Sequence, residues 1–288
     1  MEALILSLVI AALLAAFGVP RWRLKRALAQ PLAPAHVAIL RANIPVYRHM
    51  PPALQQQLHK LVRQFLYQKT FVGCAGQDIN DEVRVTIAGQ ACMLLLNRPS
   101  RVYAGLDTVL VYPSAFMAPR KHVDEAGVVT EARQDLLGES WGDGRVVLAW
   151  DHVIHGALNW TEGHNVVLHE FAHQLDSESG SNNGAPWLGD PASYRRWSEV
   201  LSRDFANLQV DAMYRQQSVL DHYGASSPAE FFAVATEAYF ARPYEMAGSH
   251  PQLFDEFMRY YRVDPREWLP APAAPEMFYG QPSYGQWQ

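Results

Sequence analysis

The chain has 288 residues and a formal net charge of −5, and 49% of its residues are hydrophobic. This length suits one large catalytic domain with a sizeable core. The negative charge argues against a nucleic-acid-binding protein, whose surface usually carries a basic patch or stripe. The two cysteines, Cys74 and Cys92, form no CxxC pair. They therefore predict neither a zinc-ribbon site nor a disulfide-rich scaffold.

The N-terminus carries an uncharged apolar run over residues 3–17, and four cations follow within residues 21–26. A helix over residues 3–20 would span about 27 Å, close to the roughly 30 Å hydrocarbon core of a bilayer. A secretory signal peptide would place its cations before the apolar run. We therefore expect residues 1–20 to form one transmembrane helix that anchors the chain in the cell membrane, with the catalytic domain on the cytoplasmic side. A soluble cytoplasmic protein is the alternative.

The first half of the remaining chain mixes helical and β-type patterns. Apolar residues recur at helical spacing over residues 54–67. Residues 83–96 first alternate and then become continuously apolar, which predicts a strand followed by a buried helix. Short β-type runs at residues 109–112 and 146–150 predict two strands. Residues 151–155, which precede a glycine, predict a turn.

Helical patterns dominate the second half. We expect helices over residues 165–176, 194–208, 227–240 and 251–261, with a Gly- and Ser-rich loop over residues 177–191. Ser227 is the predicted N-cap and Pro228 the first residue of its helix. The Pro-, Gly-, Gln- and Tyr-rich residues 270–288 predict a disordered tail. The sequence thus predicts an α+β fold over residues 21–269, mainly helical with a small mixed sheet.

The motif with the clearest chemistry is HExxH at residues 169–173. On a helix, His169 and His173 lie four residues apart on one face, so both imidazoles can reach one ion. Zinc accepts neutral imidazole nitrogens, and catalytic zinc sites keep one position open for water. Glu170 can then act as the general base toward that water. Apolar neighbours predict a buried helix, in which these polar side chains would be costly without a partner such as a metal.

The third ligand is expected from a glutamate on a second helix, because no histidine follows at the spacing of an extended HExxHxxGxxH motif. Glu230 and Glu237 both lie on the helix predicted over residues 227–240. They are seven residues apart on one face, so periodicity does not choose between them, and Glu230 could instead complete a capping box. Asp176 shares a face with the two histidines. Either Asp176 or Glu237 could orient a ligand imidazole.

Two segments resemble a known family: HEFAHQLD at residues 169–176 and DHYGASSPAEFFAV at residues 221–234. Together with weaker similarity at residues 109–113 and 146–150, they resemble the Mlc titration factor A family of bacterial glucose-regulated metallopeptidases. The resemblance spans residues 54–265. The second segment is also similar to the catalytic domain of anthrax lethal factor. The resemblance implies a zincin-like metallopeptidase of the gluzincin type. In it, one zinc ion per chain would be held by His169, His173 and Glu230, with Glu170 as the base and Tyr223 as a donor to the oxyanion.

We therefore expect a zinc metallopeptidase, of the aminopeptidase type, that acts on a peptide or protein substrate. The resemblance also implies that the strand at residues 146–150 is a sheet edge on which an extended peptide could add. An alternative function that it implies is the sequestration of a transcriptional repressor of the Mlc type, with a zinc site that modulates binding. The expected partners are thus a peptide or protein substrate, this regulator, and the membrane through the N-terminal helix, but no nucleic acid.

Overall fold

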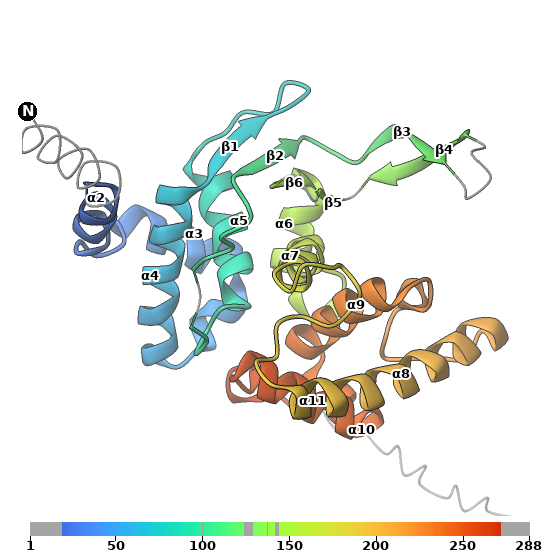
Figure 1. The fold of residues 1–288 in the computed structure, drawn as a ribbon. Helices are drawn as coiled ribbons and strands as arrows, with labels where there is room; N and C mark the ends of the chain where they lie inside the picture. The colour runs from blue at the N-terminus through green and yellow to red at the C-terminus, as the bar shows by residue number, and fades with distance from the viewer. Residues whose placement is uncertain (1–18, 100, 124–128, 137, 142–143, 272–288) are drawn as a thin grey trace, which may run out of the picture.

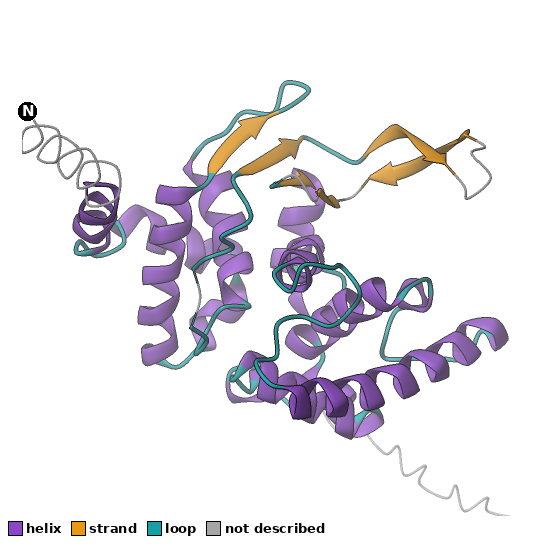
Figure 2. Cartoon of the chain, in the orientation of Figure 1, coloured by secondary structure: helices purple, strands orange, loops and turns teal. Residues whose placement is uncertain are grey.

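The computed structural model describes residues 19–99, 101–123, 129–136, 138–141 and 144–271. Helices dominate around one small four-stranded sheet (Figures 1 and 2). This arrangement confirms the predicted α+β class. Within the described residues, no helix combines the length and the apolar character that a membrane span requires. The anchor expected at residues 1–20 and the tail expected at residues 270–288 fall almost entirely outside the described residues and stay predictions.

The helices follow the expected order, with additions in the first half. In chain order they are α2 (Val19–Leu28), α3 (Pro34–Asn43), α4 (Pro52–Gln68), α5 (Asp81–Met93), α6 (Trp150–Leu158), α7 (Val166–Ser177), α8 (Pro191–Tyr214), α9 (Pro228–Ala241), α10 (Pro243–Ser249) and α11 (Pro251–Tyr261). A short 3-10 helix, η4 (His222–Ala225), precedes α9.

The main sheet is mixed and has the strand order β1-β2-β6-β5. Its strands are β1 (Thr70–Gly73), β2 (Thr108–Tyr112), β6 (Arg145–Ala149) and β5 (Gly138–Trp141). The first three run parallel, with Val109 opposite Val146, and β5 pairs antiparallel with β6. A separate hairpin of β3 (Phe116–Val123) and β4 (Val129–Leu136) extends away from the sheet (Figure 1).

The expectation that residues 146–150 form a sheet edge is wrong. Strand β6 is paired on both sides, with β2 and with β5, so β5 is the outer strand. Four consecutive residues of β6, from Val146 to Ala149, are buried. A continuous apolar run is typical of a strand that is covered on both faces.

Two further expectations differ from the structure in the first half of the chain. Residues 83–93 are helical throughout α5, where a strand was expected to begin. The Asn80 side chain caps this helix by accepting a hydrogen bond from the N–H of Val83 at 3.0 Å. Helix α5 is buried around almost its whole circumference, so its apolar residues show no single period. Residues 151–155 lie within α6 and form no turn.

Helix α7 lies in the middle of the molecule, between the sheet and the layer of α8, α9 and α11 (Figure 1). Phe171 on its inner face is fully buried. The Phe171 ring packs against those of Tyr103 and Phe65, with centroids 4.8 and 5.6 Å away. Aromatic pairs at such distances add to the hydrophobic gain of burial. This packing fixes the rotation of α7 and leaves the opposite face of the helix toward α9.

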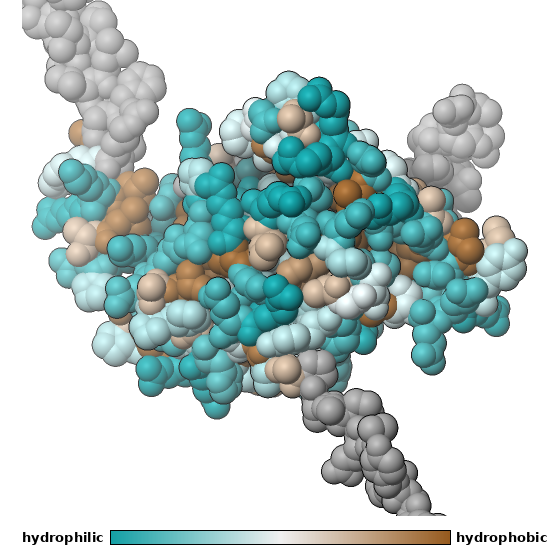
Figure 3. Space-filling view, turned by 90° about the horizontal axis from the view of Figure 1, so that it is seen from below, coloured by the Kyte–Doolittle hydropathy of each residue, from teal (hydrophilic) through white to brown (hydrophobic). Residues whose placement is uncertain are grey.

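Aromatic residues also hold α8, α9 and α11 together. Trp197 of α8 lies 5.8 Å from Phe232 of α9 and stacks at 5.4 Å on Phe257 of α11, measured between ring centroids. All three side chains are buried. The surface seen from below is mainly hydrophilic, with apolar residues in small separate patches (Figure 3). The packing of these aromatic rings therefore holds the N-terminus of α9 at a fixed position beside α7.

Candidate metal centre

The HExxH motif lies on α7, as the sequence predicts. The side chain of Asn165 caps this helix by accepting a hydrogen bond from the N–H of Leu168 at 3.0 Å. Such a cap satisfies one of the backbone donors that the first turn leaves without an intrahelical partner. The rings of His169 and His173 lie with their centroids 4.9 Å apart. The four-residue spacing thus places both imidazoles on one face, toward α9.

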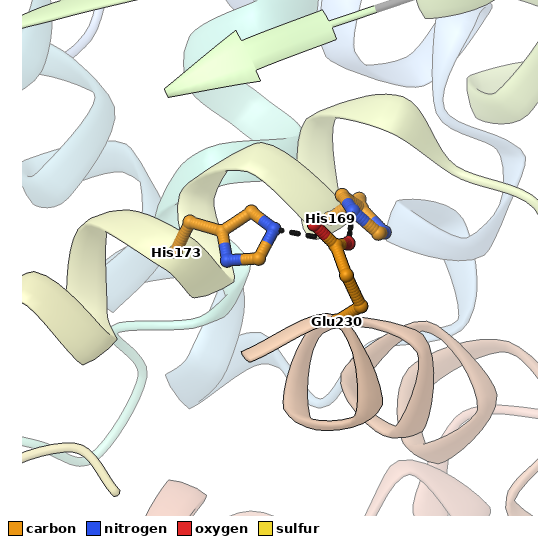
Figure 4. Close-up of side chains that lie close together, drawn as sticks. All are labelled: His169, His173 and Glu230. Carbon is orange, nitrogen blue, oxygen red and sulfur yellow. Dashed lines mark hydrogen bonds and ion pairs between the residues drawn. The ribbon is translucent and has the colours of Figure 1, made fainter. Parts of the chain in front are cut away.

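Glu230 comes from the first turn of α9. Ser227 is the N-cap of this helix and accepts a hydrogen bond from the Glu230 N–H at 3.2 Å, with Pro228 as the first helical residue. The expected N-terminus of this helix is confirmed. This cap directs the side chain of Glu230 across the gap between the helices, toward the two imidazoles of α7 (Figure 4).

The three predicted ligand side chains meet at one point. The Oε2 atom of Glu230 lies 2.9 Å from Nε2 of His169 and 3.4 Å from Nε2 of His173. One candidate ligand atom from each residue lies within 4.8 Å of the others. The side chains of His169, His173 and Glu230 are 14%, 7% and 23% exposed. The cluster is thus largely buried but reaches solvent through Glu230.

These donors fit a tetrahedral zinc ion. Zinc–ligand bonds of about 2.0–2.1 Å at tetrahedral angles place ligand atoms about 3.3–3.4 Å apart. The 3.4 Å separation between His173 and Glu230 has this value, and the 2.9 Å separation between His169 and Glu230 is that of a hydrogen bond. Two imidazole nitrogens and one carboxylate oxygen are also a common donor set of catalytic zinc sites.

Glu237 occupies the other side of His169. Its Oε1 atom accepts a hydrogen bond from Nδ1 of His169 at 2.8 Å, and its Oε2 atom accepts one from the N–H of Asn165 at 2.5 Å. Glu237 is only 7% exposed. A carboxylate bound to Nδ1 places the lone pair of a neutral imidazole on Nε2, the atom that faces Glu230. Of the two candidates for the orienting role, Glu237 thus makes the contact with a ligand histidine.

The electrostatics of the cluster favour binding of a cation. Burial alone would lower the pKa of His169, but its hydrogen bonds to Glu230 and Glu237 outweigh burial and raise the pKa well above the usual value. Burial alone would raise the pKa of Glu230, but its contacts with both histidines outweigh burial and hold the pKa far below the usual range. Two carboxylates thus share one imidazolium, and a metal ion could replace its proton.

Asp176 has a different role from the one considered for it. Its Oδ2 atom accepts a hydrogen bond from the N–H of Gly184 at 2.6 Å. Neither its Oδ1 atom nor Nδ1 of His173 has a hydrogen-bond partner among the described residues. Asp176 is fully buried, and burial raises its pKa despite the hydrogen bond from Gly184. Asp176 therefore ties the loop after α7 to the end of that helix.

The two residues expected to take part in catalysis lie beside the cluster. Glu170 on α7 is 5% exposed, and its charge contributes to the raised pKa of His169. Tyr223 lies on η4 and is 49% exposed, with its ring centroid 6.0 Å from that of His169. Asp221 caps η4 by accepting a hydrogen bond from the Tyr223 N–H at 2.7 Å. A half-exposed phenol next to a largely buried cluster lies where a substrate would approach.

Comparison with known proteins agrees with this geometry. Residues 19–262 match the family of glucose-regulated metallo-peptidases M90. The chain is 38% identical over 267 residues to the uncharacterized protein slr2042 of Synechocystis sp., covering 91% of this chain and 97% of that protein. It is 31% identical over 250 residues to Mlc titration factor A of Yersinia pestis, covering 85% of this chain and 89% of that protein. The Mlc titration factor A of Yersinia pseudotuberculosis matches to the same extent.

The family match covers α7 and α9, which carry the cluster, and η4, which carries Tyr223. The matches confirm the resemblance that the HExxH segment and the segment at residues 221–234 indicate. The chain therefore belongs to the family of glucose-regulated metallo-peptidases M90.

Proposed function

We propose that this metallopeptidase hydrolyses peptides with one zinc ion held by His169, His173 and Glu230. The observation that carries the proposal is the position of Oε2 of Glu230, within 3.4 Å of Nε2 of both histidines. Structural zinc sites usually have four protein ligands, whereas catalytic sites keep one position open. Among the described residues, His169, His173 and Glu230 form the cluster, and no fourth metal-ligating side chain joins them.

The residues around the cluster suit the hydrolysis of an amide bond. A zinc ion bound there would act as a Lewis acid toward water and toward the substrate carbonyl. Glu170 would accept the proton of the attacking water and pass it to the leaving amine. Tyr223 would donate a hydrogen bond from its hydroxyl to the oxygen that becomes negative in the transition state. The exposure of Tyr223 allows its side chain to move toward a substrate.

Strand β5 is the place where we propose that an extended substrate binds. It is the outer strand of the sheet among the described strands, and it lies against α7. One side of its backbone pairs with β6, with Ser140 opposite Val146. The other side could pair with a peptide as an added strand. A peptide in this position would run close to the metal helix. We also propose cleavage near the N-terminus of the substrate, as expected for an aminopeptidase.

Metal analysis together with activity measurements tests this proposal. We expect about one zinc ion per wild-type chain and loss of zinc in Glu230→Ala. In Glu170→Gln, zinc should be retained while hydrolysis of peptides falls by about 10²-fold or more, because the general base is lost. Full hydrolysis by Glu170→Gln would refute the mechanism. Retention of zinc by Glu230→Ala would refute the ligand set.

A second function is favoured by the name that relatives carry, Mlc titration factor A. We propose as an alternative that the chain binds a repressor of the Mlc type and thereby removes it from DNA. This function needs no general base, so the Glu170→Gln variant separates it from catalysis. Equal affinity of wild type and Glu170→Gln for a purified Mlc-type repressor would support the binding function. No measurable affinity in either protein would refute it.

We further propose that residues 21–269 form the metallopeptidase unit and that residues 1–20 attach it to the membrane. The support is the uncharged run at residues 3–17 and the cations that follow it. Cell fractionation of the full chain beside a variant that lacks residues 1–20 tests the attachment. The full chain should sediment with membranes and the shortened chain should not. Full-length chain in the soluble fraction would refute the anchor.

A further inference from the structure

A cavity outside the metal centre has four arginines among its lining residues. It has a volume of about 110 Å³ and lies between the N-terminal part of α8, the C-terminal end of α11 and the loop after α5. Its charged lining residues are Arg98, Arg196, Arg259, Arg262 and Glu256. Four guanidinium groups thus meet one carboxylate, although the chain as a whole carries a net charge of −5. Such a concentration of like charges creates a positive local potential that attracts anions.

The single carboxylate holds two of these arginines. Glu256 is 5% exposed and forms an ion pair with Arg259 and another with Arg196, the latter at 3.6 Å. Arg196 also donates a hydrogen bond to the hydroxyl of Ser193 at 3.2 Å. The carboxylate therefore balances about one of the two charges that it contacts, and it holds both guanidinium groups at the cavity wall.

Arg98 is held in place by an aromatic ring. Its guanidinium carbon lies 4.0 Å from the ring centroid of Tyr260, and it donates a hydrogen bond to the backbone oxygen of Leu94 at 3.4 Å. Tyr260 also lines the cavity, and its buried hydroxyl has no acceptor for its proton among the described residues. A guanidinium group that is already ordered loses less entropy when it binds a ligand. The cavity thus offers fixed cationic donors and one unused hydroxyl donor.

We propose that this cavity binds the phosphate group of a small molecule. Guanidinium groups bind phosphate oxygens with two parallel hydrogen bonds, and the excess of positive charge suits a dianion better than a carboxylate. The cavity is small, with a volume of about 110 Å³, and it suits a compact group such as phosphate. Trp187 also lines the cavity and is 63% exposed. Its indole could cover the rest of a phosphate ester.

The site includes a loop that also contacts the end of the HExxH helix. Trp187 belongs to the loop between α7 and α8. Within the same loop, Gly184 donates its N–H to Asp176 at the end of α7, and its carbonyl oxygen accepts a hydrogen bond from Nε1 of Trp197 at 2.8 Å. The proposed ligand would therefore contact the segment that joins the HExxH helix to α8. Its binding does not depend on the proposed peptidase mechanism.

Calorimetric titration of the metal-loaded full chain tests the proposal, in a chloride buffer free of phosphate and sulfate. The ligands are phenyl phosphate, inorganic phosphate and benzoate. We expect phenyl phosphate to bind near one per chain, and benzoate to bind at least about tenfold more weakly, because it carries one charge in place of two. Inorganic phosphate should bind as tightly as phenyl phosphate if the phosphate group alone is recognised. It should bind more weakly if Trp187 covers the rest of an ester.

Variants locate the binding site. Arg98→Gln and Arg262→Gln should each weaken the binding of phenyl phosphate about tenfold or more, since each removes a charged hydrogen-bond donor. The matched control is Arg195→Gln, an exposed arginine on α8 that does not line the cavity, and it should change affinity less than about twofold. Arg262 is exposed, so its variant keeps the test valid if Arg98→Gln folds poorly. The proposal is overturned if no ligand binds at millimolar concentration, or if a double Arg98→Gln, Arg262→Gln variant binds phenyl phosphate like wild type, which would place the ligand at the metal.

Discussion

Replacement of Glu237 by glutamine changes charge and hydrogen bonding but hardly changes size. In the wild-type chain, the two carboxylate oxygens of Glu237 accept hydrogen bonds from Nδ1 of His169 and from the N–H of Asn165. Glutamine has only one side-chain oxygen, so its NH₂ group must face one of these two donors. The substitution therefore disturbs either the imidazole or the N-terminus of α7.

The two orientations have different costs. If the glutamine oxygen faces Asn165, its NH₂ group faces Nδ1 of His169 and favours the tautomer with a proton on Nε2, the proposed ligand atom. Loss of such an orienting carboxylate typically weakens metal binding by about 10–100-fold, or about 1.4–2.7 kcal/mol. If the oxygen faces His169, the buried N–H of Asn165 loses its partner at a cost of about 1–3 kcal/mol in the free energy of unfolding.

Chelator competition measures the zinc affinity, and urea unfolding of the metal-free chain measures the stability. We expect Glu237→Gln to show one of these losses but to bind zinc more tightly than Glu230→Gln, which alters a proposed ligand. Glu245→Gln is the control, because Glu245 lies on α10, partly exposed, and its one ion pair within the described part of the chain is a 3.7 Å contact with Arg242. Wild-type zinc affinity and stability in Glu237→Gln would refute the orienting role. If Glu237→Gln lost zinc while Glu230→Gln retained it, Glu237 would be the metal ligand and Glu230 the residue that orients the imidazole.

Three further predictions concern the loop after α7, the acid limit of stability and metal uptake. Gly184 has φ +78°, and an added Cβ would lie 2.3 Å from the Pro228 carbonyl oxygen at the start of α9, an atom that cannot easily move. Gly184→Ala should therefore lower the free energy of unfolding by about 1–3 kcal/mol more than Gly180→Ala, where φ is +100° but the space is open; equal losses in urea unfolding would refute the contact. Burial would raise the pKa of Asp204, but its hydrogen bonds to a histidine and an arginine outweigh burial and lower the pKa below 3.8. The stability that this shift contributes is present above pH 3.8 and is lost as the pH falls toward the pKa of the folded chain. In urea unfolding, the difference in the free energy of unfolding between wild type and Asp204→Asn should therefore shrink below pH 3.8. The hydrogen bonds of His169 to Glu230 and Glu237 raise its pKa and favour its protonated form, so zinc binding should release a proton. The calorimetric enthalpy of zinc binding should therefore vary with the ionisation enthalpy of the buffer, and no variation would contradict this.

The parts of the site that depend on local geometry could be predicted from the sequence. The HExxH spacing predicted two imidazoles on one face of a helix, and α7 has this geometry. Ser227 and Pro228 predicted the first turn of α9, because a cap and a helix start need only neighbouring residues. The prediction failed for β6 because strand order is a long-range property. Its continuous apolar run at residues 146–149 nevertheless indicated a central strand.

Contacts between distant segments could not be predicted in this way. The arginines of the phosphate cavity come from the loop after α5, from α8 and from α11, and no sequence pattern relates them. The link between Glu237 and the backbone of Asn165 joins residues 72 positions apart. Asn165, four residues before His169, was the one local signal for this link, because the N–H of a capping residue lies at the end of the helix, which is buried here.

The seven-residue spacing between Glu230 and Glu237, which left both as candidates for the third ligand, also explains why their environments differ in the fold. Seven residues on a helix are about two turns, or about 10.5 Å along the axis, so Glu230 lies at the exposed end of α9 and Glu237 in its interior. The exposures of their side chains, 23% and 9%, follow this difference in depth. His169 lies between them and turns Nε2 to the outer carboxylate and Nδ1 to the inner one. Of these two carboxylates, the one that His173 contacts among the described residues is that of Glu230. The outer carboxylate, which is the more exposed of the two, is the one we propose as a metal ligand, and the inner one holds the imidazole of His169.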